Sequence, residues 1–462
     1  MDYKKLGFKA GLEIHQQLDT QKLFCSCPST LRDDTPHFTV TRYLRAVSGE
    51  GGDIDIAALH EHAKGLSFVY EGYDTTCLVE LDEEPPHTIN EQALGIALLL
   101  AEMMHCEIPK HMQVMRKTVI DGSNTSGFQR TVLVGRNGWI DVDGKRIGIN
   151  YLILEEDAAR RTAEDRQSVT YRLDRLGIPM LEIVTAPDMT TPDEVKETAS
   201  AIGMLLRSTG KVKRGIGTIR QDVNVSIKSH ARVEMKGVQD LREMTKYIEK
   251  EVERQTKGNE QPHVRNVKPD FTSKFLRPLP GAARMYPETD IPLILPDVKH
   301  AQLPELIEDK VQRFVTVGLG KDLAAFVAQS DKSNLFEELV KRHTVKPAFI
   351  AEVLTAKLVE LKRDFGVEGI RDEHLREVFE LLEKGKITKE IIGDVLVEMA
   401  RGRFDPEKYR TVEKSDLKKE LQAIIDKNKC APFGALMGIA VSQLKGKASG
   451  KEIAEMLKKM VG

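Results

Sequence analysis

The first 300 residues carry short runs in which apolar and polar side chains alternate, separated by turn signals. "NGWIDVDGKRIGINYLILEED" is typical of a β-hairpin that turns at Asp143-Gly144, and "GTIRQDVNVSIKSHARVEMKGV" predicts a second hairpin. Helical segments interrupt these strands: Asn90 can cap "EQALGIALLLAEMMH", and "TPDEVKETASAIGMLLRSTG" opens with Thr-Pro and closes on Gly210. The pattern predicts an α+β domain over residues 1–300, built on antiparallel sheet.

Beyond about residue 303 the alternation gives way to a period of 3.6 residues. "LPELIEDKVQRFVTVGLG", "KSNLFEELVKRH", "KPAFIAEVLTAKLVELKRDFG", "DEHLREVFELLEKG" and "TKEIIGDVLVEMARG" are amphipathic segments that end at Gly or Pro. A polar stretch, "RGRFDPEKYRTVEKSD", separates them from a last helical unit. We therefore expect a helical domain over residues 301–405 and a small helical tail domain over residues 406–462.

The strand near the N-terminus, "GLEIHQQLDT", carries two chemically active side chains. Glu13 and His15 are two residues apart, so on a strand they point to the same face, and both can bind a metal or move a proton. The alternative is an ordinary polar pair on the solvent side of an edge strand. The decapeptide alone does not separate the two interpretations.

Charge and composition exclude several classes of protein. The 69 Lys and Arg nearly balance the 71 Asp and Glu, which excludes a histone-like polycation. The tail over residues 406–462 is different, with 12 Lys and Arg against 7 Asp and Glu. No apolar run reaches the roughly 20 residues of a membrane helix, and the N-terminus lacks the apolar core of a signal peptide. We expect a soluble, cytoplasmic protein with no membrane partner.

The five cysteines suggest neither a disulfide framework nor a complete metal site. Their odd number in a long chain argues against disulfides. Cys25-x-Cys27 is half of a zinc site, but structural zinc takes four ligands, and Cys77, Cys106 and Cys430 are scattered singly along the sequence. We therefore expect no zinc. The sequence also contains no recognisable motif for hydrolysing an amide.

Several segments are rich in carboxylates where strands are usually apolar. They comprise Glu155, Glu156 and Asp157 in "LEEDAARR", Asp174 and Arg175 in "YRLDRLG", Glu182 in "MLEIV", Arg220, Asp222 and Asn224 in "IRQDVNVS", and Glu234 and Lys236 in "RVEMKG". Each alone is ordinary for a solvated face or a surface ion pair. Together they favour one acidic pocket, and clustered oxygen ligands suit Mg²⁺ that is shared with substrate phosphates.

Seven motifs in order resemble those of the tRNA-dependent amidotransferase family. They are "GLEIHQQLDTQKLFC", "CLVELDEEPP", "RKTVIDGSNTSGFQRT", "LEEDAARR", "DRLGIPMLEIV", "GTIRQDVNVS" and "GAARMYPETD". Three of these stretches, "SNTSGFQRT", "LEEDAARR" and "GAARMYPETD", resemble the E-type subunit of archaeal glutamyl-tRNA(Gln) amidotransferase more than the related bacterial B-type subunit. The resemblance implies an antiparallel-sheet catalytic cradle followed by the helical domain and the tail, which would bind tRNA.

The resemblance also implies a reaction and its participants. ATP would phosphorylate the γ-carboxylate of glutamate carried on tRNA(Gln), and ammonia would displace the phosphate to give glutaminyl-tRNA(Gln). An asparaginase-like partner, the D-type subunit, would supply the ammonia, which is consistent with the missing amidase motif. The expected cofactors are ATP and Mg²⁺.

Site residues follow from the resemblance residue by residue. Glu13, His15, Glu156 and Glu182 would hold Mg²⁺ or guide ammonia. Lys117 would face phosphate, and Asp222 would complete the catalytic wall. The residues that would bind the nucleotide, by the same match of motifs, are Lys117, Arg220, Asn224 and Tyr286.

One departure and two alternatives accompany this assignment. E-type subunits usually carry an inserted synthetase-like domain, for which the stretch at about 256–277 leaves no room; we expect that stretch to be poorly ordered or discontinuous. A non-catalytic tRNA-binding or assembly protein is the first alternative. A B-type enzyme that also acts on aspartyl-tRNA(Asn) is the second.

Overall fold

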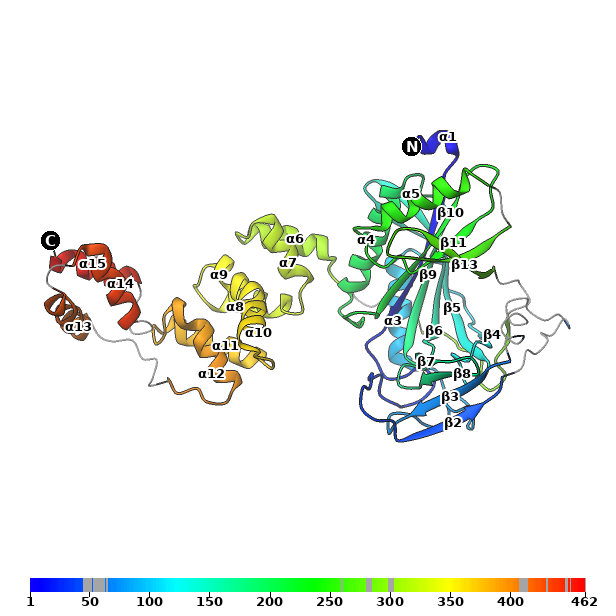
Figure 1. Ribbon diagram of the computed structural model, residues 1–462, viewed down its shortest axis with the longest axis horizontal. Helices are drawn as coiled ribbons and strands as arrows, with labels where there is room; N and C mark the ends of the chain where they lie inside the picture. Colours follow the sequence, from blue (N-terminus) through cyan, green and yellow to red (C-terminus); the bar gives the residue numbers. More distant parts are fainter. Residues whose placement is uncertain are drawn as a thin grey trace. The chain divides into compact units, whose positions relative to one another are not determined.

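The chain forms two compact units, Met1–Pro304 and Glu305–Gly462, and each is described by itself (Figure 1). The computed structural model describes residues 1–44, 52, 63, 65–258, 261–279, 285–297, 303–406, 414–428, 431–444, 448 and 450–461. Within these residues the first unit contains strands and helices, and the second contains helices without strands. The predicted α+β class with a helical C-terminal part is confirmed.

Ten strands of the first unit form one sheet in the order β13-β12-β11-β10-β1-β9-β6-β5-β4-β14. Most neighbours run antiparallel, as expected, but β11 and β12 pair in parallel. β1 lies between β9 and β10, so it is a central strand and not an edge strand. The bounds are β1 Lys9–Gln17, β4 Val114–Thr118, β5 Phe128–Val142, β6 Lys145–Glu156, β9 Pro179–Thr185, β10 Ile219–Ser226, β11 Val233–Lys236, β12 His263–Val267, β13 Ser273–Pro278 and β14 Met285–Pro287.

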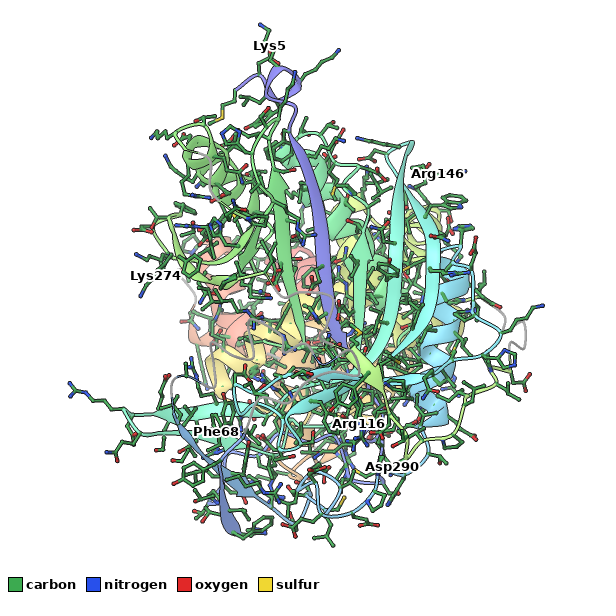
Figure 2. The ribbon with its side chains drawn as sticks, turned by 90° about the vertical axis from the view of Figure 1, so that its right-hand side faces the viewer. Lys5, Phe68, Arg116, Arg146, Lys274 and Asp290 are labelled. Atoms are coloured by element: carbon green, nitrogen blue, oxygen red, sulfur yellow. The ribbon has the colours of Figure 1, made fainter. Side chains whose placement is uncertain are left out.

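Local sequence explains how these strands connect. Asp143 and Gly144 both have positive φ, 51° and 77°, which is the backbone that a two-residue hairpin turn requires, and β5 and β6 pair on either side as predicted. The second predicted hairpin, β10 with β11, is also present. Figure 2 shows the strands side by side, with Lys274 of β13 and Arg146 of β6 on opposite sides.

Three helices pack against the large sheet. They are α3 (Glu91–Met103) against β5 and β6, α4 (Pro192–Ser208) against β1 and β5, and α5 (Met244–Gln255) against β10. Asn90 caps α3 by accepting a hydrogen bond from Ala93 N at 3.0 Å, and Thr191 caps α4 by accepting one from Glu194 N at 3.2 Å. A short helix, α1 (Tyr3–Leu6), precedes β1. The helices and the sheet enclose one apolar core that includes Leu12, Ile14, Ile183 and Val223.

A smaller sheet of four strands also belongs to the first unit. Its order is β2-β3-β8-β7, with β2 Phe38–Arg42, β3 Ser67–Gly72, β7 Arg160–Glu164 and β8 Ser168–Arg172. β3 and β8 pair in parallel, while the other two pairs are antiparallel. Phe68, Tyr70, Tyr171 and Leu173 form its separate apolar cluster.

The stretch at 256–277 does not match the expectation. Outside residues 259–260, which lie beyond the described part, it contains β12 and most of β13, which pair antiparallel and extend the large sheet. Val264 is fully buried and His263 is 4% exposed. The expectation of a poorly ordered or discontinuous stretch is therefore wrong, because strand pairing satisfies the backbone of a segment whose composition buries little.

The second unit follows the predicted helical periodicity. Its elements are α6 Ile307–Thr316, α7 Lys321–Gln329, α8 Ser333–Arg342, α9 Pro347–Glu352, the π-helical turn η2 Val353–Lys357, α10 Leu358–Phe365, α11 Asp372–Glu383, the 3₁₀ turn η3 Lys389–Ile391, α12 Ile392–Ala400, α13 Lys414–Lys427, α14 Phe433–Gln443 and α15 Gly450–Val461. The last three share a separate apolar cluster centred on Leu421, Leu436 and Leu457. Among the described helices, none combines the length and the apolar character of a membrane span.

Candidate functional site

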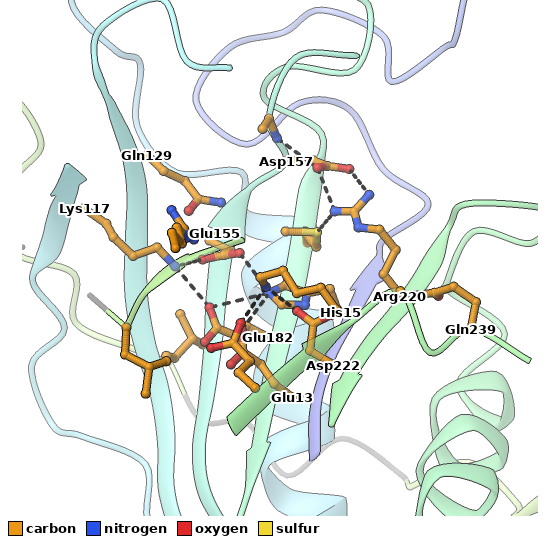
Figure 3. A pocket seen from close by; sticks show the side chains of 18 of the residues that line it. Glu13, His15, Lys117, Gln129, Glu155, Asp157, Glu182, Arg220, Asp222 and Gln239 are labelled. Carbon is orange, nitrogen blue, oxygen red and sulfur yellow. Dashed lines mark hydrogen bonds and ion pairs between the residues drawn. The ribbon is translucent and has the colours of Figure 1, made fainter. Parts of the chain in front are cut away.

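A cavity of about 740 Å³ opens on the large sheet of the first unit (Figure 3). Its lining side chains come from strands that are far apart in sequence: β1, β4, β5, β6, β9, β10, β11, β13 and β14. Six carboxylates and five Lys or Arg side chains are among the described residues that line it. This volume lies within the range of small-molecule sites, and the balance of charges suits a charged ligand.

Glu13 and His15 reach this cavity because of the position of β1. Residues two apart on a strand share a face, and the apolar neighbours Leu12 and Ile14 are buried on the opposite face. His15 is paired in register with Glu182 on β9, and Glu13 with Asp222 on β10. Cross-strand partners point the same way, so the four side chains stand together. The interpretation as an edge-strand surface pair is excluded.

The ligand atoms of Glu13, His15 and Glu182 all lie within 4.8 Å of one another. His15 Nε2 is 3.7 Å from Glu13 Oε1 and 3.8 Å from Glu182 Oε2. Two carboxylates and one imidazole at this spacing can surround a single cation, and carboxylate oxygens are preferred ligands of Mg²⁺. The three residues therefore fit the divalent cation that the sequence predicts.

Lys117 sits at the edge of this group. Its Nζ donates to Glu155 Oε2 at 2.7 Å and to Glu182 Oε2 at 3.1 Å. Glu155 Oε1 lies 3.7 Å from His15 Nε2, so Glu155 contacts both the imidazole and the ammonium. The Lys117 ammonium thus offsets part of the negative charge of Glu155 and Glu182, two buried carboxylates that would otherwise be costly to keep ionised.

The surroundings change the acidity of each member of the group. Burial, and then repulsion from Glu182, raises the pKa of Glu13 to about 8. Burial also raises the pKa of Glu155 to about 8. Although burial opposes it, the charge of Lys117 lowers the pKa of Glu182 to about 2. Burial lowers the pKa of His15, which keeps the imidazole neutral and able to bind a metal.

Two further ion-pair groups form the other walls. Arg220 Nη2 donates to Asp157 Oδ1 at 2.9 Å, and Gln17 Nε2 donates to Asp157 Oδ2 at 2.6 Å. Lys236 Nζ lies 2.5 Å from Asp222 Oδ2 and 2.7 Å from Glu234 Oε1. Of the predicted site residues, the structure brings Glu13, His15, Lys117, Glu182, Arg220 and Asp222 into this cavity.

Glu156 lies outside the lining of this cavity, in contrast to its predicted place in the metal-binding group. Its carboxylate accepts from Arg130 N at 3.3 Å and lies 3.6 Å from Arg130 Nη1, away from the cavity lining. Glu155 takes its place. Ile153 is paired with Glu182, and Glu155 is two residues further along β6, so period-2 alternation applied to "YLILEED" would have selected Glu155.

Two predicted nucleotide residues also lie outside the lining of this cavity. The Tyr286 ring packs edge-to-face on Phe128 at 6.3 Å, with the Arg116 guanidinium 6.0 Å from the ring centre. Arg116 in turn reaches Glu288 and Asp290, which follow β14 (Figure 2). Asn224 has a buried side-chain oxygen without a hydrogen-bond partner among the described residues.

A second potential metal site lies outside the cavity. Cys25, Cys27, Cys77 and Glu80 each offer a ligand atom within 4.8 Å of the others. Glu80 Oε1 lies 3.2 Å from Cys25 Sγ, and Glu80 Oε2 lies 3.9 Å from Cys27 Sγ. These distances bracket the roughly 3.5 Å between a carboxylate oxygen at about 2.0 Å and a thiolate at about 2.3 Å on a tetrahedral zinc. The premise that Cys77 stands apart from the pair is therefore wrong, and the donor set fits Zn²⁺. Cys430 lies outside the described residues.

Glu80 is held in place by other buried groups. Lys22 Nζ lies 2.7 Å from Glu80 Oε1, with both side chains almost fully buried, and Cys77 N donates to Glu80 Oε2 at 2.6 Å. Such contacts orient a ligating carboxylate and supply a positive charge beside a thiolate site.

Comparisons with known proteins cover nearly the whole chain. A family model described as the GatB/GatE catalytic domain matches residues 8–301, and one described as the GatB domain matches residues 334–461. The E-type subunit of glutamyl-tRNA(Gln) amidotransferase from Methanocaldococcus jannaschii is 37% identical over 625 aligned positions, which cover 99% of each chain. The corresponding proteins of Archaeoglobus fulgidus and Sulfurisphaera tokodaii are 36% and 34% identical, covering 98–100% of each chain.

The alignment with the Methanocaldococcus protein is more than 150 positions longer than this chain, so that relative carries residues with no counterpart here. That those residues form the inserted domain near 256–277 stays a prediction. The chain belongs to the E-type family of glutamyl-tRNA(Gln) amidotransferase subunits, within the larger GatB/GatE group.

Proposed function

We propose that this chain is the kinase and transamidase component of an enzyme that converts glutamyl-tRNA(Gln) into glutaminyl-tRNA(Gln), with ATP and Mg²⁺. The names of its relatives specify the tRNA substrate and the amidotransferase reaction. The observation that carries the proposal is the convergence of Glu13, His15 and Glu182 beside Lys117 in one cavity.

In the first step, an oxygen of the glutamate γ-carboxylate attacks the γ-phosphorus of ATP, and the bond from that phosphorus to ADP breaks. Mg²⁺ held by Glu13, His15 and Glu182 would neutralise charge on the phosphate oxygens. Lys117 lies beside the same group and supports a phosphoryl oxygen with its ammonium. Positioning and charge neutralisation provide most of the catalysis in phosphoryl transfer, so rigid strands are a suitable frame for these side chains.

In the second step, ammonia attacks the γ-carbonyl carbon and inorganic phosphate leaves. The attacking nitrogen must lose a proton. Glu155 can accept it in its ionised form, because its carboxylate lies at the edge of the metal-binding group, beside His15 and Lys117. We assign the proton transfer to Glu155.

Ammonia and tRNA would come from outside the cavity. We propose that an asparaginase-like partner releases the ammonia, because the sequence contains no amidase motif. The helices α13–α15 would hold the tRNA backbone, since Lys418, Lys419, Lys451, Lys458 and Lys459 give this part of the chain its positive charge. Both participants fit a protein that works in translation in the cytoplasm.

The deciding experiment is an amidation assay with glutamyl-tRNA(Gln), ATP and Mg²⁺, with the asparaginase-like partner present or withheld. We expect product with the partner, and with free ammonia when the partner is withheld. Binding of tRNA without any ATP-dependent product under either condition would instead support a non-catalytic assembly protein. Equal turnover of aspartyl-tRNA(Asn) would support a B-type enzyme.

A further inference from the structure

Two arginine side chains of the cavity have no partner within the described part of the chain. Lys117, Arg220 and Lys236 are all paired with cavity carboxylates. Arg232 and Arg277 also line the cavity, yet neither side chain makes a hydrogen bond or an ion pair with any described residue. The Nε of Arg277 is buried and has no acceptor among the residues that the structure describes. A buried donor without an acceptor is unfavourable, so a ligand that supplies one is favoured there.

The sheet places these two arginines at the side away from the metal-binding group. Arg277 on β13 is paired with Val264 on β12, which is paired in turn with Glu234 on β11, and Arg232 directly precedes β11. Along the sheet, β13 is four strands from β1 and β11 is two, or roughly 19 Å and 10 Å at the usual strand spacing. Arg277 and Arg232 therefore stand away from β1, where they can bind a group other than the one that reacts near Glu13 and Lys117.

We propose that Arg232 and Arg277 form a phosphate subsite that holds a non-reacting phosphate of a substrate. This inference rests on the proposed function, whose substrates limit the choice of anion. In glutamyl-tRNA the α-carboxylate is esterified, and the γ-carboxylate must lie at the reacting centre. The remaining anions are phosphates, of the nucleotide or of the RNA 3′ end. The planar guanidinium pairs with phosphate oxygens through two parallel hydrogen bonds.

The test compares Arg277→Gln and Arg232→Gln with a matched control, Lys274→Gln. Lys274 is exposed on the same strand as Arg277 and does not line the cavity, so its loss removes equal charge at a neighbouring place. Two probes are titrated separately without turnover: Mg·ATP by equilibrium dialysis, and uncharged tRNA(Gln) by filter binding at several salt concentrations. Thermal melting of each variant shows whether the fold is kept.

We expect each arginine variant to weaken one probe on the order of 10-fold relative to Lys274→Gln. If only the affinity for Mg·ATP falls, the subsite holds a phosphate of the nucleotide. If only the affinity for tRNA(Gln) falls, the subsite holds a phosphate of the RNA 3′ end. The slope of log affinity against log salt concentration should then shrink by roughly 0.7, the value for one single-stranded phosphate contact. Arg277→Lys should recover only part of the affinity, because an ammonium lacks the planar fork.

Affinity for both probes equal to that of Lys274→Gln would overturn the subsite. If Arg277→Gln does not fold, the exposed Arg232 provides the same comparison. These binding measurements are independent of amidation. A wild-type protein that binds both probes but makes no glutaminyl-tRNA would contradict the proposed function and leave the subsite standing.

Discussion

His15 on β1 and Glu182 on β9 are direct cross-strand partners, with His15 Nε2 3.8 Å from Glu182 Oε2. Glu182 also accepts a hydrogen bond from Lys117 Nζ at 3.1 Å. The Glu182 carboxylate therefore links the His15 imidazole to Lys117, the side chain that would face phosphate. Substitution of Glu182 should affect the first chemical step, the transfer of the phosphoryl group.

Glu182→Gln keeps the size of the side chain and removes its charge. We expect kcat for ATP-dependent amidation to fall on the order of 10²–10³-fold, as when one preorganised electrostatic group is lost. Affinity for tRNA should stay within about twofold, measured by filter binding. Glu164→Gln on β7 is the control, because the Glu164 carboxylate forms an ion pair with Arg161 and does not line the cavity. Rescue by free ammonia would place Glu182 in ammonia delivery instead.

Glu155 and Glu156 are adjacent, but they should respond differently to the same substitution. Glu155→Gln should lower kcat strongly, because Glu155 contacts Lys117 and the metal-binding group. Glu156→Gln should leave kcat within a few-fold and lower the free energy of unfolding by about 1–3 kcal/mol, because it weakens the buried pair with Arg130. Steady-state kinetics and thermal melting separate the effects, and equal loss of kcat in both variants would contradict the assignment.

Mg²⁺ affinity should rise with pH. Because the pKa of Glu13 is raised to about 8, the carboxyl holds a proton at neutral pH without a metal and must release it when the metal binds. Affinity should therefore increase between about pH 6 and 8 and then level off. Calorimetry in two buffers of different ionisation enthalpy measures the released proton. An affinity that does not change over this range would show that Glu13 is already ionised.

Cys25, Cys27, Cys77 and Glu80 should bind zinc. Metal analysis should find about one zinc per chain, and Co²⁺ in its place should give the charge-transfer absorption of cobalt–thiolate bonds. Cys77→Ser should weaken this absorption, whereas Cys106→Ser, at a cysteine outside the cluster, should not. A protein without zinc and without the cobalt absorption would restore the original expectation from the sequence.

Truncation after Pro406 should raise the KM for glutamyl-tRNA(Gln). The removed helices α13–α15 have their own apolar cluster, so their loss should leave the first unit folded. Because phosphate contacts release counterions, the difference between truncated and full-length protein should be largest at low salt and shrink as salt rises. Unchanged tRNA affinity at moderate salt would remove the tail from the tRNA-binding surface.

The sequence determined the local structure of this protein to a large degree. The Asp143-Gly144 turn, the Asn90 cap and the helical repeat after residue 303 were all predicted, because each depends on residues within a few positions of one another. The shared face of Glu13 and His15 also followed from the sequence alone, since strand geometry fixes it.

Tertiary structure decided which of these local features meet. Only the pairing of β1 with β9 and β10 makes β1 a central strand and brings Glu182 and Asp222 to its active face. Only the register of β6 against β9 selects Glu155 over Glu156, because a shift by one residue would reverse the two faces. The approach of Cys77 to Cys25 and the position of Arg277 depend on loops and strands distant in sequence. Such long-range contacts are set by packing of the whole fold, which no short stretch of sequence encodes.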